Sequence, residues 1–341
     1  MPVVRSVRLR DLHEFATNPT PSSVRHSARF LQNQIPARIQ NTLETFSQLP
    51  PSVQGSFSVR KMINSLGAAR ENINSLFVPT QLKECLDHSN ELAHTVRTLD
   101  IDARSLCSSL RDDRIRLRAH TDSIETLASA TFKLLLPLRL FVSHYSYAAT
   151  HVSGINDDAK EHRTIDKENT VIPEKKSKSP EIRLGPVLSN HSLQAIIEAA
   201  VFDSQAFAVE KFGAAPEVEI RVSDDNMGLT CLCVDAHVHY VCMELLKNSY
   251  RAMITKYGAL EVKEAHPIVI FISCSENAAG ISIEDSGGGM SIDSQRNAFR
   301  FFHTTAPPLV ATYTYSRQFG AAFDGLVCIC TIDISFISLD D

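Results

Sequence analysis

A charged stretch from Gly154 to Arg183 divides the 341-residue chain into two parts with different patterns. It contains acidic and basic residues but almost no large apolar side chains, as in NDDAKEHRTIDKENTVIPEKKSKSPEIR. Such a segment cannot bury enough apolar surface to fold alone, which predicts a solvated linker. A chain of this length is also more than one core usually fills. We therefore expect two domains, at residues 27–153 and 184–341, joined by a linker at 154–183.

The part before the linker has the apolar spacing of helices. In FLQNQIPARIQNTLETF, Ile35, Ile39, Leu43 and Phe46 recur at steps of four, four and three. Pro36 suits the first turn of such a helix. Further helical stretches are expected near residues 60–76, 81–97, 108–130 and 131–147. Together they predict a domain that is similar to a four-helix bundle.

The part after the linker mixes helices with strands. A helix is predicted from Ser192 to Phe212. The segments EVEIRV, LTCLCV, IVIFISC and AGISIED alternate apolar and polar residues and are rich in β-branched side chains, which predicts strands. The closing run around Ile332 to Phe336 alternates in the same way and is a candidate for one more strand. This half is therefore expected to be α/β or α+β.

Composition excludes several classes of protein. The chain has 43% hydrophobic and 21% charged residues and a net charge of -5, so it lacks the basic footprint of a nucleic-acid binder. The most apolar segment, Phe132 to Val142, contains Lys133, Pro137 and Arg139, and we expect no membrane span. Residues 1–26 carry arginines near the start and are interpreted as a targeting or flexible segment.

The eight cysteines indicate packed thiols more than a metal site. Two pairs have C-x-C spacing, which places both sulfur atoms on one face of a strand. The C-x-x-C pairs that typify zinc sites are missing. Because there is also no dense cysteine framework, a reducing compartment fits best.

One predicted helix, within MELLKNSYRAM, has a polar stripe. At about 100° per residue, Glu244, Lys247, Asn248 and Arg251 fall on one arc of roughly 100°. Spacing alone favours a solvated surface stripe. Asn248 makes that interpretation weaker, because asparagine is a poor helix former in mid-helix. Its amide oxygen can also ligate a hard cation beside phosphates. Glu244, one turn earlier, has the chemistry of a general base.

Three consecutive glycines follow a predicted strand in IEDSGGGMS, residues 283–291. Each glycine loses more backbone freedom on folding than any other residue, so the run should bring a compensating gain. By itself the segment is typical of a loose turn at the end of a strand. Its position some thirty residues after the polar stripe is the more informative observation.

The combination E-x-x-K-N-x-x-R-A, then a strand ending in D-x-G-G-G, resembles the GHKL ATPases, which include histidine kinases and gyrase-type topoisomerases. Their Bergerat fold is an α/β sandwich that binds ATP beneath a lid. The narrower resemblance is to the mitochondrial kinases of the pyruvate and branched-chain 2-oxoacid dehydrogenases. It rests also on ARFLQNQIPARIQNTL (28–43), RAHTDSIETLA (118–128), RLFVSHY (139–145) and FFHTTAP (301–307). The resemblance covers residues 28–325.

The resemblance implies a role for each matching residue. Asn248 would ligate Mg²⁺, and Glu244 would be the base that activates the substrate serine. Lys247 and Arg251 would complete the nucleotide-facing stripe. Asp285 would accept a hydrogen bond from the adenine amine, and Gly287 and Gly289 would let the backbone run close to the nucleotide. Thr304 and Thr305 would lie near the phosphates. His120 would correspond to the histidine that the family places in its helical bundle near the catalytic helix.

The resemblance further implies a protein serine kinase that uses Mg-ATP to phosphorylate the E1 alpha subunit of a 2-oxoacid dehydrogenase complex. Among these complexes, pyruvate dehydrogenase is the expected substrate. The expected location is the mitochondrial matrix. The lipoyl domain of E2 would be a second partner, and a homodimer is left open. The family's second glycine cluster is missing after Gly325, so the GHKL domain is expected to be truncated at its C-terminus. This leaves a catalytically silent module that docks on the complex as the alternative, with histidine-kinase-like signalling as a weaker third.

Overall fold

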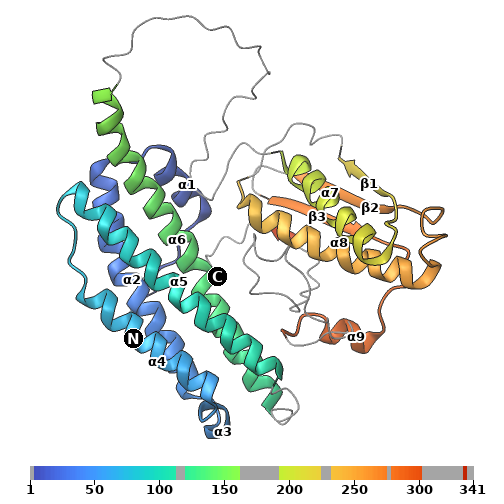
Figure 1. The fold of residues 1–341 in the computed structure, drawn as a ribbon, viewed down its shortest axis with the longest axis horizontal. Coiled ribbons are helices and arrows are strands. Elements are labelled where there is room, and N and C mark those ends of the chain that lie inside the picture. Colours follow the sequence, from blue (N-terminus) through green and yellow to red (C-terminus); the bar gives the residue numbers. More distant parts are fainter. Residues whose placement is uncertain are drawn as a thin grey trace, which may run out of the picture. The chain divides into compact units, whose positions relative to one another are not determined.

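The structure is a computed structural model that describes residues 4–112, 120–161, 192–223, 232–274, 278–301 and 333–335. The chain divides into two compact units, Met1–Pro186 and Val187–Asp341. The first unit is helical, whereas the second combines helices with a mixed sheet (Figure 1). The expected combination of an α and an α/β part is therefore confirmed. The finer domain limits and the linker at 154–183 stay predictions.

Four long helices make up most of the first unit: α2 (Pro21–Ser47), α4 (Phe57–Ser75), α5 (Leu82–Asp112) and α6 (Thr121–Glu161). α2 packs on α4, α4 on α5, α5 on α6 and α6 on α2, so the contacts close a ring. Two short helices, α1 (Leu9–Thr17) and α3 (Pro51–Gln54), precede α2 and α4. The described residues thus form a four-helix bundle, whose interior contains the fully buried Phe46, Leu66, Leu99 and Leu138.

The predicted start of the first bundle helix is wrong. α2 begins at Pro21, so Pro36 lies inside the helix and not in its first turn. The real start has its own signals: Pro21 occupies the first helical position, and the Thr20 Oγ1 atom accepts a hydrogen bond of 3.1 Å from the Ser23 N–H. The apolar residues on either side of Pro36 hold the helix together by burial, which outweighs the unfavourable proline.

The predicted break between residues 130 and 131 is also wrong, because α6 is continuous there. Thr131 is fully buried, and its Oγ1 donates a hydrogen bond of 2.8 Å to the Leu127 carbonyl one turn earlier. The hydroxyl is therefore satisfied without ending the helix. At its other end α6 continues to Glu161, beyond residue 153 where the bundle was expected to end.

Residues 4–26, expected as a targeting or flexible segment, are packed in the structure. α1 lies against α6, and Leu12 and Ala16 are buried. The Arg5 N–H also donates a hydrogen bond of 2.8 Å to the Gln34 side chain on α2. A targeting role for the segment stays a prediction.

In the described part of the chain, one helix, Thr121–Ser153 within α6, is long and apolar enough to cross a membrane by length and composition, with a mean hydropathy of 1.3. In its most apolar window 44% of the residues are buried inside the protein. A core helix of a bundle meets the same criterion, so this finding gives only weak support to a membrane span. The ring of contacts around α6 accounts for its apolar residues.

Two histidines are buried in the bundle, and burial lowers the pKa of both His88 and His144. The His88 Nδ1 atom lies 3.2 Å from the Tyr145 hydroxyl, and the His144 Nδ1 atom lies 2.8 Å from the Leu140 carbonyl. The Nε2 atoms of both are buried without a hydrogen-bond partner among the described residues. The positive charge of His13 on α1 also lowers the pKa of His144.

We expect the first unit to lose stability as the pH falls below about 6.5, the usual pKa of histidine in an unfolded chain. Because both folded pKa values are lowered, the unfolded state binds more protons in that range, at most about 1.4 kcal/mol per pH unit for each histidine. Urea unfolding at about pH 7.5 and about pH 5.5 tests this. His144→Leu should flatten the pH dependence, and an equal slope in the variant would contradict the prediction.

The second unit contains α7 (Leu193–Phe212), β1 (Val218–Val222), α8 (Asp235–Tyr257), β2 (Ile268–Cys274), β3 (Ala278–Glu284), α9 (Ile292–Asn297) and β4 (Asp333–Ser335). The sheet order is β1-β2-β3-β4; β1 and β2 are parallel, and the other pairs are antiparallel. Three predicted strands are confirmed as β1, β2 and β3. β4 confirms that the closing run contains a strand.

The predicted strand LTCLCV is not confirmed. Of its residues only 232–234 are described, and they contain an isolated bridge at Cys233 in place of a strand. The cysteines themselves behave as expected where they are described. Cys85, Cys107, Cys233 and Cys242 are buried.

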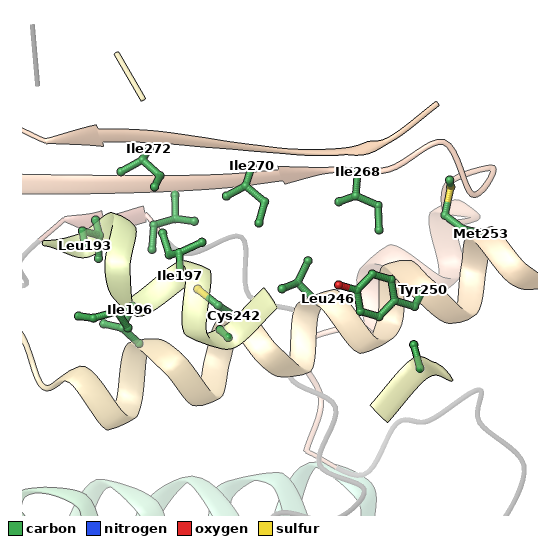
Figure 2. Close-up of a cluster of buried hydrophobic side chains, with 14 of the residues drawn as sticks. Leu193, Ile196, Ile197, Cys242, Leu246, Tyr250, Met253, Ile268, Ile270 and Ile272 are labelled. Carbon is green, nitrogen blue, oxygen red and sulfur yellow. The ribbon is translucent and has the colours of Figure 1, made fainter. Parts of the chain in front are cut away.

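α7 and α8 pack on one face of the sheet and form the core of the second unit (Figure 2). Ile268, Ile270 and Ile272 alternate along β2, so all three point from the same face of the strand toward these helices. Leu246 and Tyr250 of α8 are fully buried beneath them. Burying one arc of α8 in this way leaves its opposite arc for other contacts.

Candidate functional site

The polar stripe predicted from sequence lies on α8, on the arc that does not enter the core. Glu244, Lys247, Asn248 and Arg251 are all half-buried. The Lys247 Nζ atom lies 2.7 Å from Glu244 Oε1, and both side chains are about a quarter exposed. The Oε2 atom of Glu244 makes no hydrogen bond within the described residues. The stripe is therefore partly ordered, with one carboxylate oxygen still available as an acceptor.

Asn248 has an unsatisfied amide. Its Nδ2 atom is buried and has no hydrogen-bond partner among the described residues. A buried N–H without an acceptor is unfavourable by about 1–3 kcal/mol. A ligand that brings acceptor oxygens to this place would remove that cost. The other end of the amide is an oxygen, a donor type that hard cations prefer.

Asp285 is held beside α8 by two hydrogen bonds. Its Oδ2 atom accepts from the Ser249 hydroxyl of α8 at 2.8 Å, and its Oδ1 atom accepts from the Gly287 N–H at 2.9 Å. Each carboxylate oxygen can accept a further hydrogen bond. Because the side chain is exposed, that capacity faces solvent. Asp285 is therefore a fixed acceptor with room for a donor from a ligand.

The glycine loop, Asp285–Gly289, is attached to the C-terminal part of α8. The Ser286 carbonyl accepts hydrogen bonds from Lys256 at 2.6 Å and from the Tyr257 hydroxyl at 3.2 Å. The Ser286 hydroxyl lies 3.1 Å from the Met253 sulfur. The loop at the strand end is thus anchored, unlike a loose turn.

The structure explains why this loop needs glycine. A Cβ atom on Gly287 would lie 2.5 Å from the Cβ of Ala252 on α8, closer than real Cβ contacts. Gly288 and Gly289 have positive φ angles of 104° and 71°, which disfavour other residues. Gly287 therefore serves the approach of the loop to α8, and Gly289 serves the backbone turn. That Gly287 and Gly289 also leave room for a bound nucleotide stays a prediction.

Sequence reasoning missed Ser249 and the α7 residues next to the stripe. Phe207 of α7 lies beneath the Lys247 ammonium, 4.7 Å from ring centroid to nitrogen. Lys211, one turn later on α7, lies over the same ring at 5.3 Å. The signal for Ser249 was a serine in mid-helix, where its propensity is poor. The i, i+4 pair Phe207 and Lys211 was visible, but nothing in the sequence placed it beside α8.

The proposed roles of three further predicted site residues, Thr304, Thr305 and His120, stay predictions. Thr304 and Thr305 lie outside the described residues, as do Gly320 and Gly325. His120 is described within the first unit, just before α6, where its Nε2 atom lies 2.9 Å from the Ser52 hydroxyl. Its role stays a prediction.

The known proteins that this chain is similar to are mitochondrial kinases of 2-oxoacid dehydrogenases. The family described as mitochondrial branched-chain alpha-ketoacid dehydrogenase kinase matches residues 6–135, within the first unit. A mitochondrial pyruvate dehydrogenase (acetyl-transferring) kinase of Ascaris suum is 20% identical over 84% of this chain and 67% of its own length. Its counterpart in Schizosaccharomyces pombe is 22% identical over 88% of this chain and 79% of its own length. Pyruvate dehydrogenase (acetyl-transferring) kinase isozyme 1 of Rattus norvegicus is 21% identical over 84% of this chain and 62% of its own length.

These similarities extend beyond the bundle, because an alignment over 84% of the chain must enter the second unit. The chain is thus similar to protein kinases in both its units. More narrowly, it is similar to the mitochondrial kinases of the 2-oxoacid dehydrogenases, by a family match within the bundle and by relatives at 20–22% identity.

Proposed function

We propose that this chain is an ATP-dependent protein serine kinase of a mitochondrial 2-oxoacid dehydrogenase complex, with a GHKL nucleotide site in its second unit. The observation that carries the proposal is the pairing of Asp285 with Ser249. It joins the acceptor for adenine to the same helix that presents Glu244 and Asn248. The names of the relatives supply the reaction class.

In this proposal the chain's own residues divide the work along α8. Asp285 accepts the adenine amine, directly or through water, while Ser249 and the Gly287 N–H keep its carboxylate oriented. Glu244 would take the proton of the substrate serine as the serine oxygen bonds to the terminal phosphorus of ATP, while the bond from that phosphorus to its bridging oxygen breaks and ADP leaves. Lys247 holds one oxygen of Glu244, which leaves the other to accept the proton. Lys247 and Arg251 offset negative charge on the phosphates.

Mg²⁺ is the cation that the site fits. The amide of Asn248 has the right donor type, and a single protein ligand suits a metal held mainly by phosphates and water. Among the described residues no group of three or more histidine, cysteine or acidic side chains is placed to hold a metal ion by itself. When bound, Mg²⁺ would neutralise charge that develops on the transferring phosphoryl group.

The substrate would be the E1 alpha subunit, most readily of the pyruvate complex, and the lipoyl domain of E2 would dock the kinase. These partners, a homodimer and residence in the mitochondrial matrix are supported by the relatives' names and by the resemblance. The first unit would serve docking and regulation, as its match to the family of mitochondrial kinases favours.

The proposal is tested by measuring ATP binding and phosphate transfer with the full chain. We expect binding of ATP with Mg²⁺ by calorimetry and transfer of labelled γ-phosphate to serine on purified E1. Both the pyruvate and the branched-chain E1 should be offered. Binding of ATP without phosphoserine on either E1 alpha subunit would overturn the kinase.

A silent docking module is the second candidate. It is favoured by the family match, which lies within the helical unit alone. Binding of a lipoyl domain without transfer would select this candidate.

Ser249→Ala should raise the KM for ATP about three- to tenfold and leave kcat nearly unchanged, because one hydrogen bond that orients the carboxylate of the adenine acceptor is lost. Thr255→Ala is the matched control, since its hydroxyl bonds only to the carbonyl of Arg251 within α8. A purely structural role would lower kcat and thermal stability together. An unchanged KM would show that Ser249 does not position Asp285.

A further inference from the structure

Two lysines from different helices share one aromatic ring beside the polar stripe. The ammonium groups of Lys247 on α8 and Lys211 on α7 lie 4.7 and 5.3 Å from the centroid of the Phe207 ring. Lys211 also lies 5.5 Å from the ring of Phe212. Lys247 has the carboxylate of Glu244 as partner, whereas Lys211 makes no ion pair within the described part of the chain.

This arrangement places positive charges close together. Partial burial, and then the nearby charges of Lys247 and Arg251, lower the pKa of Lys211. Attraction to the face of the Phe207 ring offsets only part of such repulsion, because a partly exposed cation–π contact contributes about 0.5–1 kcal/mol. The arrangement becomes favourable once an anion lies between the cations.

We infer that Lys211, held beside Lys247 by Phe207, forms an anion subsite that binds the phosphate chain of a nucleoside triphosphate. This inference rests on the proposed function and extends the nucleotide site from α8 to α7. Neither the sequence patterns nor the resemblance assigns a role to Lys211 or Phe207. The subsite would act by charge-assisted hydrogen bonds from the two ammonium groups to phosphate oxygens.

The position of the subsite favours a nucleotide over an acidic peptide. Lys247 and Ser249 are two residues apart, about 200° around α8, so they lie on opposite flanks of the helix. Ser249 holds Asp285 on one flank, and Phe207 and Lys211 adjoin Lys247 on the other. A ligand that satisfies both flanks needs a hydrogen-bond donor at one end and several negative charges at the other. A nucleoside triphosphate has both.

The test compares ligands that carry the phosphates with one that does not. Lys211→Ala in the full chain should weaken ATP and inorganic tripolyphosphate about tenfold, as expected for one hydrogen bond to a charged group, and leave adenosine unchanged. Lys211→Arg should keep most of the affinity. Lys263→Ala is the matched control, because Lys263 is exposed elsewhere in the second unit.

Each outcome decides the inference. Unchanged affinities for ATP and tripolyphosphate in Lys211→Ala would overturn it while the proposed function stands, provided that Asp285→Ala still weakens ATP. If Lys211→Ala lowers only phosphate transfer to the protein substrate and leaves ATP and tripolyphosphate affinity unchanged, Lys211 binds an acidic peptide. That result would also overturn the inference. If the unaltered chain binds no ATP, the proposed function fails, and tripolyphosphate binding alone then decides whether the anion subsite exists.

Discussion

Glu244→Gln should abolish phosphate transfer while ATP binding stays within about twofold. A general base contributes roughly 10²- to 10⁴-fold to the rate, and glutamine cannot accept the serine proton. The amide oxygen can still accept the hydrogen bond that the Lys247 ammonium now gives to Glu244 Oε1 at 2.7 Å. The variant therefore keeps the shape of the polar stripe and removes only its basicity. Single-turnover transfer from labelled ATP, together with calorimetric ATP binding, measures both quantities.

Glu261→Gln provides the control for this variant, because Glu261 is an exposed acid in the same unit. It should transfer phosphate at the unaltered rate. Retained transfer by Glu244→Gln would remove the carboxylate from the mechanism. Loss of ATP binding in the same variant would instead show that Glu244 contributes to nucleotide affinity.

Asp285→Ala should weaken ATP binding about 10- to 100-fold, as expected when a hydrogen bond to a charged acceptor is lost. Discrimination between ATP and GTP should fall as well, because the carboxylate is the proposed reader of the adenine amine. The Gly287 N–H loses its acceptor but is near the surface and can bond to water, whereas the Ser249 hydroxyl is buried and loses its partner. We therefore expect the fold to survive with a loss of about 1–3 kcal/mol in stability.

Glu284→Ala is the matched control, since Glu284 is an exposed acid at the adjacent position at the end of β3. It should leave ATP affinity unchanged. Equal affinity of Asp285→Ala and the unaltered chain for ATP would refute the nucleotide site. Weaker binding of ATP and GTP by the same factor would point to distortion of the glycine loop in place of lost recognition.

The strands of the second unit were predictable because their side chains alternate. Ile268, Ile270 and Ile272 enter one core, and that period of two is readable without knowledge of the partner helices. Helix boundaries were less predictable. Pro36 and Thr131 both resemble helix ends locally, but burial on the bundle's inner faces continues the helices through them. Tertiary packing overrides local propensity in these cases.

The polar stripe was predictable for the same reason, since helical period alone places Glu244, Lys247 and Asn248 together. The contacts that complete the candidate site were not. Ser249 and Asp285 are 36 residues apart in sequence, and Phe207 reaches Lys247 from another helix. Such long-range contacts depend on how α7, α8 and the sheet pack, which no local pattern specifies. The requirement for Gly287 likewise comes from Ala252 across the gap.

The attachment of the glycine loop to α8 fixes a spacing within the proposed site. Ser249, Met253, Lys256 and Tyr257 of one helix all contact Asp285 or Ser286. Glu244 lies five residues before Ser249, which is about 7.5 Å along the axis of the same helix. The proposed base and the proposed adenine acceptor are therefore both held by one helix at a fixed spacing. Because Asp285 directly follows β3, a displacement of α8 relative to the sheet would have to break these hydrogen bonds or bend the chain at the end of β3.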